Sequence, residues 1–316
     1  MIFKHMNKIT ACLFVLMIVS PLYAQDRQPI IDMHLHAYPV GHFWPAGAPN
    51  PATGVPSPET DEELFRQTQE AMERHNIVLA VTSGYPYDVV LDWTKKSPER
   101  IIPSPYVGGS RGFWPDIDFL RQYHQNGELG AIGELGLQYQ GLTLSSPEAE
   151  PYLALAEELD VPLGVHVGPS PPGATYDCCP DFRAAHANPL LIEEALARHP
   201  DLRVYIMHAG YPFIDETIAL LHAHPQVYAD LAVINWVIPR DEFHYYLKRL
   251  VQAGFHERLM YGSDQMFWPE TIETGIESIK TADFLTIEQK RDIFYNNAAR
   301  FLRLSEKEIA RHHIEK

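Results

Sequence analysis

The stretch Pro29-Ile30-Ile31-Asp32-Met33-His34-Leu35-His36 is a short apolar run that ends in two histidines separated by one residue. Side chains alternate across a β-strand, so residues two positions apart lie on the same face. If this run forms a strand, the imidazoles of His34 and His36 project together from its C-terminal end. Paired nitrogen ligands suit a zinc-type ion. The run therefore predicts a strand that carries two metal ligands.

Strand-like and helix-like segments alternate after this run. The apolar, strand-like ranges are Ile30–Met33, Ile77–Thr82, Ile101–Val107, Leu129–Leu135, Pro162–Val167, Leu202–Met207, Val227–Leu231 and Arg258–Tyr261. Helical spacing with proline or acidic residues near the start marks Pro58–His75, Pro115–Gln125, Pro147–Leu159, Leu190–Arg198, Asp215–Ala223 and Asp241–Ala253, and more weakly Asp88–Lys96. Strands separated by single helices are typical of parallel βαβ units. Eight of them in succession predict an α/β fold, a single-domain (β/α)8 TIM barrel.

Four more candidate residues stand where predicted strands end. They are Glu134 near the end of the fourth strand, His166 near the end of the fifth, His208 directly after the sixth and Asp264 after the eighth. Barrel enzymes place their chemistry at the C-terminal ends of the strands, so these side chains are expected to converge with His34 and His36. Each has an ordinary alternative, such as Asp264 capping the next helix. Their joint position at strand ends favours a metal site.

The N-terminal residues have the layout of a secretory signal peptide. Lys4 and Lys8 precede an apolar run from Ile9 to Ser20, and Ala24 offers a small residue for cleavage. The run is short for a membrane span, although an uncleaved signal anchor is the alternative. We predict residues 1–24 as a signal peptide and residues 25–316 as the barrel domain, exported to the periplasm or out of the cell.

The chain is strongly acidic. Its 25 lysines and arginines face 41 aspartates and glutamates, a formal net charge of −16, and removal of Lys4 and Lys8 with the signal peptide makes it −18. Such a surface repels phosphate backbones and anionic lipids. We therefore expect a small-molecule substrate, no nucleic-acid partner, and no membrane association after signal cleavage.

Two adjacent cysteines, Cys178 and Cys179, remain after the signal peptide. Adjacent cysteines form a disulfide only with a distorted backbone. The sequence leaves open whether they form that disulfide or stay as two free thiols. It contains neither a disulfide scaffold nor a zinc knot.

From Ile30 to the segment Asn296-Asn297-Ala298-Ala299-Arg300-Phe301-Leu302, the chain resembles the amidohydrolase superfamily of metal-dependent hydrolases, in particular its amidohydrolase-2 branch. The resemblance implies that His34, His36, His166 and Asp264 hold a divalent metal, usually zinc. It implies that His208 binds a second metal or positions the reacting water. Glu134 matches members that use it to hold two metals, whereas the whole chain looks more like members that need one, so the resemblance leaves one or two ions open.

The residues and the resemblance together favour hydrolysis at a carbonyl, as in a lactone, ester or amide. Metal-acidified water would attack, Asp264 would act as general base, and His208 would orient the water or stabilise the oxyanion. Decarboxylation of an aromatic or unsaturated acid is the alternative. A non-catalytic periplasmic protein that binds a metal or ligand is the second alternative.

Aromatic residues mark the loops at the predicted catalytic mouth. The tripeptide Phe-Trp-Pro occurs at residues 43–45, 113–115 and 267–269, and the predicted substrate-binding residues are Trp44, Arg111, Trp114, Trp236 and Trp268. Rigid aromatic walls favour a flat or apolar ligand, and an arginine pairs with carboxylates. The hypothesis is an aromatic or cyclic acid, ester or lactone. Loop packing or a homodimer interface would explain the same aromatics.

Overall fold

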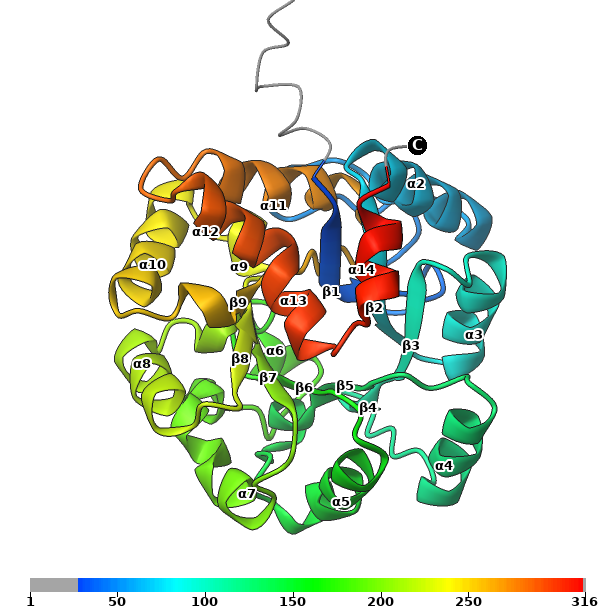
Figure 1. Ribbon diagram of the computed structural model, residues 1–316. Coiled ribbons are helices and arrows are strands. Elements are labelled where there is room, and N and C mark those ends of the chain that lie inside the picture. Colours follow the sequence, from blue (N-terminus) through cyan, green and yellow to red (C-terminus); the bar gives the residue numbers. More distant parts are fainter. Residues whose placement is uncertain (1–27, 315–316) are drawn as a thin grey trace, which may run out of the picture.

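In the computed structural model, which describes residues 28–314, parallel strands line a central barrel and helices surround it (Figure 1). The strands are β1 (Ile30–His36), β2 (Ile77–Gly84), β3 (Ile101–Pro105), β4 (Val107–Gly108), β5 (Ile132–Gly136), β6 (Leu163–His166), β7 (Val204–Met207), β8 (Tyr228–Asp230) and β9 (Leu259–Met260). All eight predicted strand positions are confirmed. The third is interrupted at Tyr106, which divides it into β3 and β4.

The strands form two parallel sheets that together make a ring. One sheet has the order β1-β2-β3 and the other runs from β4 to β9 in chain order. The chain itself joins β3 to β4. At the other junction the Met33 N–H donates to the carbonyl of Tyr261 at 2.9 Å, and the Asp264 N–H donates to the carbonyl of His34 at 2.7 Å. These bonds place β1 beside the end of β9 and close the ring.

The helices of the described residues include the seven predicted segments, among them the weakly marked one after the second strand, and others that the sequence reasoning did not predict. They are α2 (Asp61–Arg74), α3 (Tyr87–Lys96), α4 (Ile117–Gln125), α5 (Glu150–Leu159), α6 (Ala174–Asp177), α7 (Glu193–Arg198), α8 (Ile214–Ala223), α9 (Ile234–Val237), α10 (Arg240–Gln252), α11 (Glu270–Lys280), α12 (Ile287–Arg291), α13 (Asn297–Phe301) and α14 (Glu306–His312). Short 3-10 turns lie at η1 (Leu137–Gln140), η2 (Pro147–Ala149), η3 (Ala184–Ala187), η4 (Pro189–Ile192), η5 (His208–Gly210) and η6 (His256–Arg258), and η7 (Asp292–Asn296) is a π-helix.

Local chemistry explains where several helices begin. The side chain of Thr60 accepts the N–H of Glu63 at the start of α2, and Asp116 caps α4 in the same way. The predicted helices at Pro147 and Leu190 begin with the 3-10 turns η2 and η4 instead of α-helix. Tight i→i+3 turns are frequent at helix N-termini, so these are differences of boundary.

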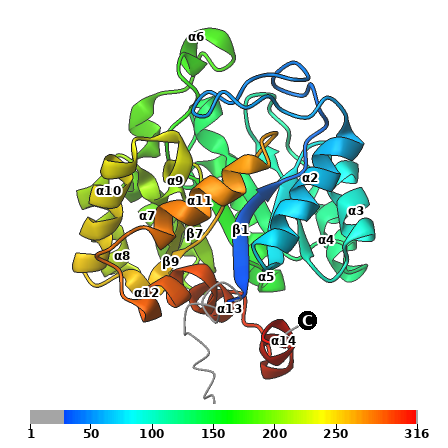
Figure 2. The same cartoon turned by 90° about the horizontal axis from the view of Figure 1, so that it is seen from above.

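The core has an inner and an outer part. The inner cluster includes Ile31, Met33, Met207 and Met260 from the strands, together with Phe301 from the C-terminal helices. The outer cluster packs the strands against the surrounding helices. Figure 2 shows α6 at one end of the barrel and α13 and α14 at the other. The two ends of the molecule are therefore built from different parts of the chain.

The structure answers the open question about the two cysteines but does not describe the predicted signal peptide. Cys178 and Cys179 form a disulfide in the loop that follows β6, with Cα atoms 3.8 Å apart. The predicted signal peptide, residues 1–24, lies outside the described residues and stays a prediction. Within residues 28–314, no helix is long and apolar enough to cross a membrane.

Candidate metal centre

The six predicted metal-site residues converge at the C-terminal end of the barrel. They are His34 and His36 in β1, Glu134 in β5, His166 in β6, His208 just after β7, and Asp264 after β9. Each is at most 6% exposed. The alternation expected for β1 is observed, because Leu35 belongs to the outer core whereas the two imidazoles face each other inside. Asp264 does not cap a helix, since the following helix α11 begins at Glu270.

The ligand atoms lie close together. The Nε2 atoms of His34 and His36 are 3.1 Å apart, and Glu134 Oε2 is 3.6 Å from the first and 3.3 Å from the second. Asp264 Oδ1 lies 3.1 Å from His36 Nε2. The other carboxylate oxygen of Glu134 lies 3.7 Å from His166 Nε2. Glu134 thus faces the β1 histidines with one oxygen and His166 with the other.

Asp264 also reaches toward His208, whose Nε2 atom is 4.0 Å from Asp264 Oδ2. Three overlapping groups of nearby ligand atoms therefore fit a metal ion: His34, His36 and Glu134; His34, His208 and Asp264; and Glu134, His166 and His208.

Hydrogen bonds on the far side of the rings orient three of the histidines. His34 Nδ1 lies 3.0 Å from Asp230 Oδ2, His36 Nδ1 lies 3.3 Å from the carbonyl of Ser83, and His208 Nδ1 lies 3.0 Å from the carbonyl of Ala232. Carbonyl and carboxylate oxygens accept, so each Nδ1 carries a proton and each Nε2 faces the centre. Such outer contacts fix the tautomer of metal-binding histidines.

The charges at the centre also favour a cation. Burial disfavours charge on His34, yet Asp264 and Asp230 raise the pKa of its imidazole well above the usual value. Burial would raise the pKa of Glu134, but contacts with His34 and His36 hold it well below its usual range. Against the same burial effect, these two histidines lower the pKa of Asp264 to about 2. Protons on the imidazoles or a cation between them would balance this negative charge.

The donor set itself fits a divalent ion. Asp264 Oδ1 is buried and makes no hydrogen bond within the described residues, although it faces His36 Nε2 at 3.1 Å. Two electron-pair acceptors at this distance are stable only with a proton or a cation between them. Imidazole nitrogens and carboxylate oxygens are ligands that zinc and related ions accept.

His166 differs from the other histidines. Burial and the neighbouring His208 lower the pKa of His166 to about 3, so its ring is neutral at physiological pH, the form that binds metals. The hydroxyl of Tyr139 lies 3.3 Å from its Nε2 atom, and its Nδ1 atom has no hydrogen-bond partner in residues 28–314.

Asp230, at the end of β8, is a functional residue that the sequence reasoning missed. It is fully buried, and besides His34 it accepts the N–H groups of His208 at 2.8 Å and Ala232 at 3.0 Å. Asp230 therefore orients two of the candidate ligands at once. Its position at the end of a predicted strand, beside the other strand-end residues, was the available signal.

The backbone is strained where it presents these ligands. His208, Ala209 and Asp264 have φ angles of 61°, 49° and 48°, in the left-handed region that non-glycine residues rarely adopt. Such strain persists only where the surroundings hold it, and it concentrates at functional sites. The backbone of Gly168 also approaches His208 closely, because a Cβ atom at this position would lie 2.5 Å from the Cβ of His208.

The predicted substrate-binding residues occupy different environments. Trp236 and Trp268 are buried, and their indole N–H groups donate to the carbonyls of Ser263 and Ala48. Trp44 is half-buried, with its ring centre 5.2 Å from that of Trp268. These contacts pack the mouth loops onto the barrel, so their contact with substrate stays a prediction.

The other two predicted substrate residues lie further out. The half-buried Trp114 packs beside Tyr152 of α5, and Arg111 is exposed. The guanidinium of Arg111 donates to the carbonyl of His42 at 2.7 Å and lies 5.9 Å from the centre of the Phe43 ring.

A stack of rings that the sequence reasoning missed connects the centre to this outer region. Tyr38 stacks on His36 with ring centres 4.7 Å apart, and His42 stacks on Tyr38 at 5.6 Å. Tyr38 also contacts Phe267, from the third Phe-Trp-Pro motif, at 5.8 Å. The motif's phenylalanines therefore belong to the aromatic wall as much as its tryptophans do.

Comparison with known proteins identifies the family of the chain. A family model described as amidohydrolase matches residues 31–304. The curated protein fluG of Emericella nidulans is 25% identical over 142 residues, which is 40% of this chain and 16% of that protein. The chain thus aligns with only about a sixth of the length of this relative.

Solved structures show the same fold. A probable 2-pyrone-4,6-dicarboxylic acid hydrolase from Acinetobacter baumannii, with citric acid bound, superposes with a TM-score of 0.59 at 15% identity, covering 87% of this chain and 99% of that chain. A 5-carboxyvanillate decarboxylase from Novosphingobium aromaticivorans, complexed with manganese and a nitrobenzoic acid, has a TM-score of 0.59 at 14% identity, covering 89% and 99%.

Proposed function

This chain belongs to the amidohydrolase-2 family, and we propose that it is a hydrolase that cleaves a C–O or C–N bond at the carbonyl of a small aromatic or cyclic acid, ester, amide or lactone. Membership makes it a metal-dependent enzyme of the hydrolase or decarboxylase type. Hydrolysis, zinc as the metal, the substrate class and export are the parts that we propose.

The observation that carries hydrolysis is the position of the Asp264 carboxylate. Its Oδ1 atom lies 3.1 Å from His36 Nε2, where it would contact a bound ion, and its Oδ2 atom lies 4.0 Å from His208 Nε2, on the side where a water would be oriented. Because the pKa of Asp264 is lowered to about 2, the carboxylate is ionised at neutral pH. It can therefore accept a proton from an attacking water and return it to the leaving group.

The remaining residues have distinct roles. His34, His36, His166 and Asp264 would hold a divalent ion, and Glu134 would join them if two ions bind. The ion would act as a Lewis acid that polarises a carbonyl and acidifies water. His208 donates its Nδ1 proton to Ala232, so its Nε2 lone pair can accept a hydrogen bond from the attacking water. This tautomer favours orientation of the water over stabilisation of an oxyanion.

The substrate class is supported by the aromatic wall and by one arginine. Tyr38, Phe43 and Phe267 form contacting rings beside His36, and Arg111 lies at the outer end of this wall. Solved relatives in this fold are named for acid substrates, and one holds a nitrobenzoic acid. A planar acid could lie along the rings and extend its carboxylate toward Arg111.

Decarboxylation of an aromatic acid is the second candidate, favoured by the same wall and by the structural likeness to decarboxylases. A product assay separates the two. The full chain is incubated with aromatic lactones and esters and, separately, with hydroxybenzoates. We expect a new carboxylate and no carbon dioxide; release of carbon dioxide from a hydroxybenzoate without lactone or ester cleavage would replace hydrolysis by decarboxylation.

The metal is tested on protein purified without added metal or a metal-binding tag. We expect zinc by mass spectrometry. Two ions per chain would make Glu134 and His208 metal ligands. One ion would place Glu134 outside the coordination shell and leave His208 the role of orienting the water. A protein that contains no metal and takes up no zinc would contradict the proposal.

Export is tested by fractionating cells that produce the full chain and locating it in the periplasm or medium.

A further inference from the structure

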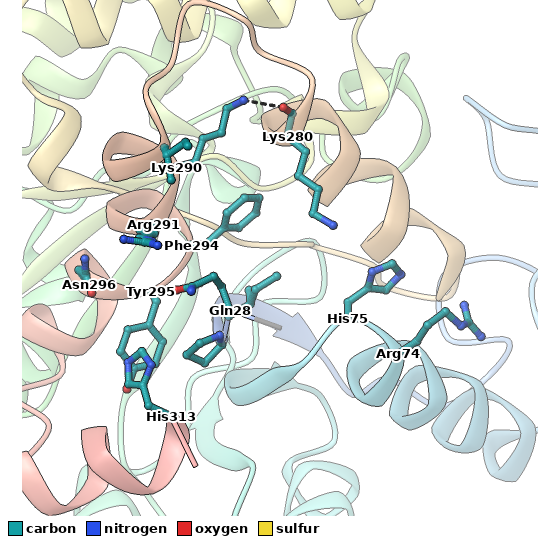
Figure 3. Close-up of a pocket in the computed structure, with 13 residues that line it drawn as sticks. Gln28, Arg74, His75, Lys280, Lys290, Arg291, Phe294, Tyr295, Asn296 and His313 are labelled. Carbon is teal, nitrogen blue, oxygen red and sulfur yellow. Dashed lines mark hydrogen bonds between the residues drawn. The ribbon is translucent and has the colours of Figure 1, made fainter. Parts of the chain in front are cut away.

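A pocket of about 320 Å³ lies at the end of the barrel opposite the metal centre. It surrounds the start of β1 and is lined by the ends of α2, α11 and α12, by η7 and by the C-terminal segment after α14. Figure 3 shows its basic residues around this space, with Phe294 among them. Those residues are Arg74, His75, Lys280, Lys290, Arg291 and His313.

The composition of this pocket departs from that of the chain. None of its lining residues is acidic, although the whole chain has 41 acidic against 25 basic side chains. Helix C-termini attract cations, which accounts for a basic residue at each helix end. That effect does not account for a pocket at which three such ends meet, with four lysine and arginine side chains and two histidines.

Acidic residues lie beside the pocket without lining it. Glu273 is 3.9 Å from Arg74 Nη1 and from His75 Nε2, and Glu277 Oε1 is 3.6 Å from Lys280 Nζ, while both glutamate side chains are exposed. His75 Nε2 is buried and makes no hydrogen bond within the described residues. Lys290 is fixed in place, because its ammonium donates to the carbonyl of Lys280 at 2.6 Å (Figure 3).

We propose that this pocket binds a small organic dianion, namely a dicarboxylate or a phosphate monoester. Its volume is in the range of small-molecule sites. Arginine and lysine donors arranged around one space suit carboxylate or phosphate oxygens. Phe294 and Ile287 add apolar surface for a short carbon skeleton. The site is independent of the proposed hydrolysis, which takes place at the other end of the barrel.

The test is isothermal titration of the metal-loaded full chain with glutarate and with glycerol 3-phosphate, at matched ionic strength. Neutral glutaramide and sodium chloride are the control titrants. We expect saturable binding of one dianion per chain, at least about tenfold weaker in Lys290→Gln/Arg291→Gln, because each lost charge-assisted bond contributes strongly. Tighter binding of glutarate assigns a dicarboxylate, and tighter binding of glycerol 3-phosphate assigns a phosphate.

Control variants separate this pocket from other cationic sites. Lys95→Gln/Lys96→Gln removes the same charge from the exposed end of α3, and Arg111→Gln removes a cation at the mouth; neither should weaken binding. Arg74→Gln/Arg291→Gln changes only exposed side chains, so it repeats the test if the Lys290 variant unfolds. Absence of saturable binding, or equal binding by the pocket variants and the wild-type chain, would overturn the proposal.

Discussion

The two ends of the barrel concentrate charge in opposite ways. At the C-terminal end, Glu134 and Asp264 are at most 6% exposed and are surrounded by four imidazoles, three of which have hydrogen-bonded outer nitrogens. At the N-terminal end, cationic side chains such as Arg74 and Arg291 are exposed on helix ends. Buried, fixed ligands favour tight and selective binding, whereas exposed charges give weaker binding that salt screens.

Replacing both β1 histidines should have the largest effect on metal binding and activity, and the effect should be limited to the C-terminal end of the barrel. We expect His34→Ala/His36→Ala to lose bound metal and about a thousandfold in kcat/KM, if the Lewis acid contributes roughly 4 kcal/mol. Metal analysis and steady-state kinetics measure this. Dianion binding at the opposite pocket should be unchanged, and a parallel loss there would show that the variant had unfolded.

Asp230→Asn tests whether the orienting contacts matter as much as the ligands. The amide keeps the shape of the side chain but replaces one acceptor oxygen by an NH₂ donor, which then faces either the Nδ1 proton of His34 or the N–H groups of His208 and Ala232. We expect roughly 10- to 100-fold weaker metal affinity, measured by competition with a chelator. Asp118→Asn, on the exposed surface of α4, is the matched control, and equal affinity in both variants would contradict the role.

Gly168→Ala tests how closely the mouth is packed. The added methyl group would lie 2.5 Å from the Cβ of His208 and 2.7 Å from its Cδ2, so the ring or the backbone must move. We expect a loss of about 1–3 kcal/mol in the free energy of unfolding, together with weaker metal binding. Denaturant unfolding with and without zinc measures both, and unchanged values would mean that His208 moves freely.

A change in salt concentration should affect ligand binding at the two ends of the barrel differently, without any mutation. Raising ionic strength from about 0.1 M to about 1 M shortens the Debye length from roughly 10 Å to 3 Å. Dianion affinity at the exposed pocket should then fall severalfold, while metal occupancy of the buried centre stays constant. Titration and metal analysis across the same salt series check this, and equal sensitivity of the two ends would remove the distinction between them.

The smallest expected effect is a pH dependence at His199, just after α7. Although burial disfavours its charged form, the hydrogen bonds that its ring donates to Glu157 and Glu150 raise the pKa of His199. A raised pKa in the folded state means stabilisation below about pH 6.5, which is lost as pH rises through the folded-state value. His199→Gln should therefore cost about 1 kcal/mol or less at pH 5.5, and less at pH 8.5, in denaturant unfolding.

The metal centre was largely predictable because its ligands are tied to local patterns. His34 and His36 share a strand face through simple alternation, and the other four candidates follow apolar runs that form the successive strands. Asp230 was missed because its role depends on a hydrogen bond to a residue 196 positions away. The tryptophans were predicted as a group, yet burial divides Trp236 and Trp268 from Trp114, which packs on a helix outside the mouth.

The sequence by itself determined the order of strands and helices and the residue type at each strand end, since apolar periodicity and helix-start signals act over a few neighbouring residues. The tertiary structure alone decided which nitrogen of each histidine faces the centre, whether Cys178 and Cys179 are paired, and where the basic helix ends meet. Arg74, Lys280 and Arg291 carry no common motif, and only closure of the barrel brings them around one pocket. Short-range patterns depend on local backbone geometry, whereas these contacts depend on how distant segments pack.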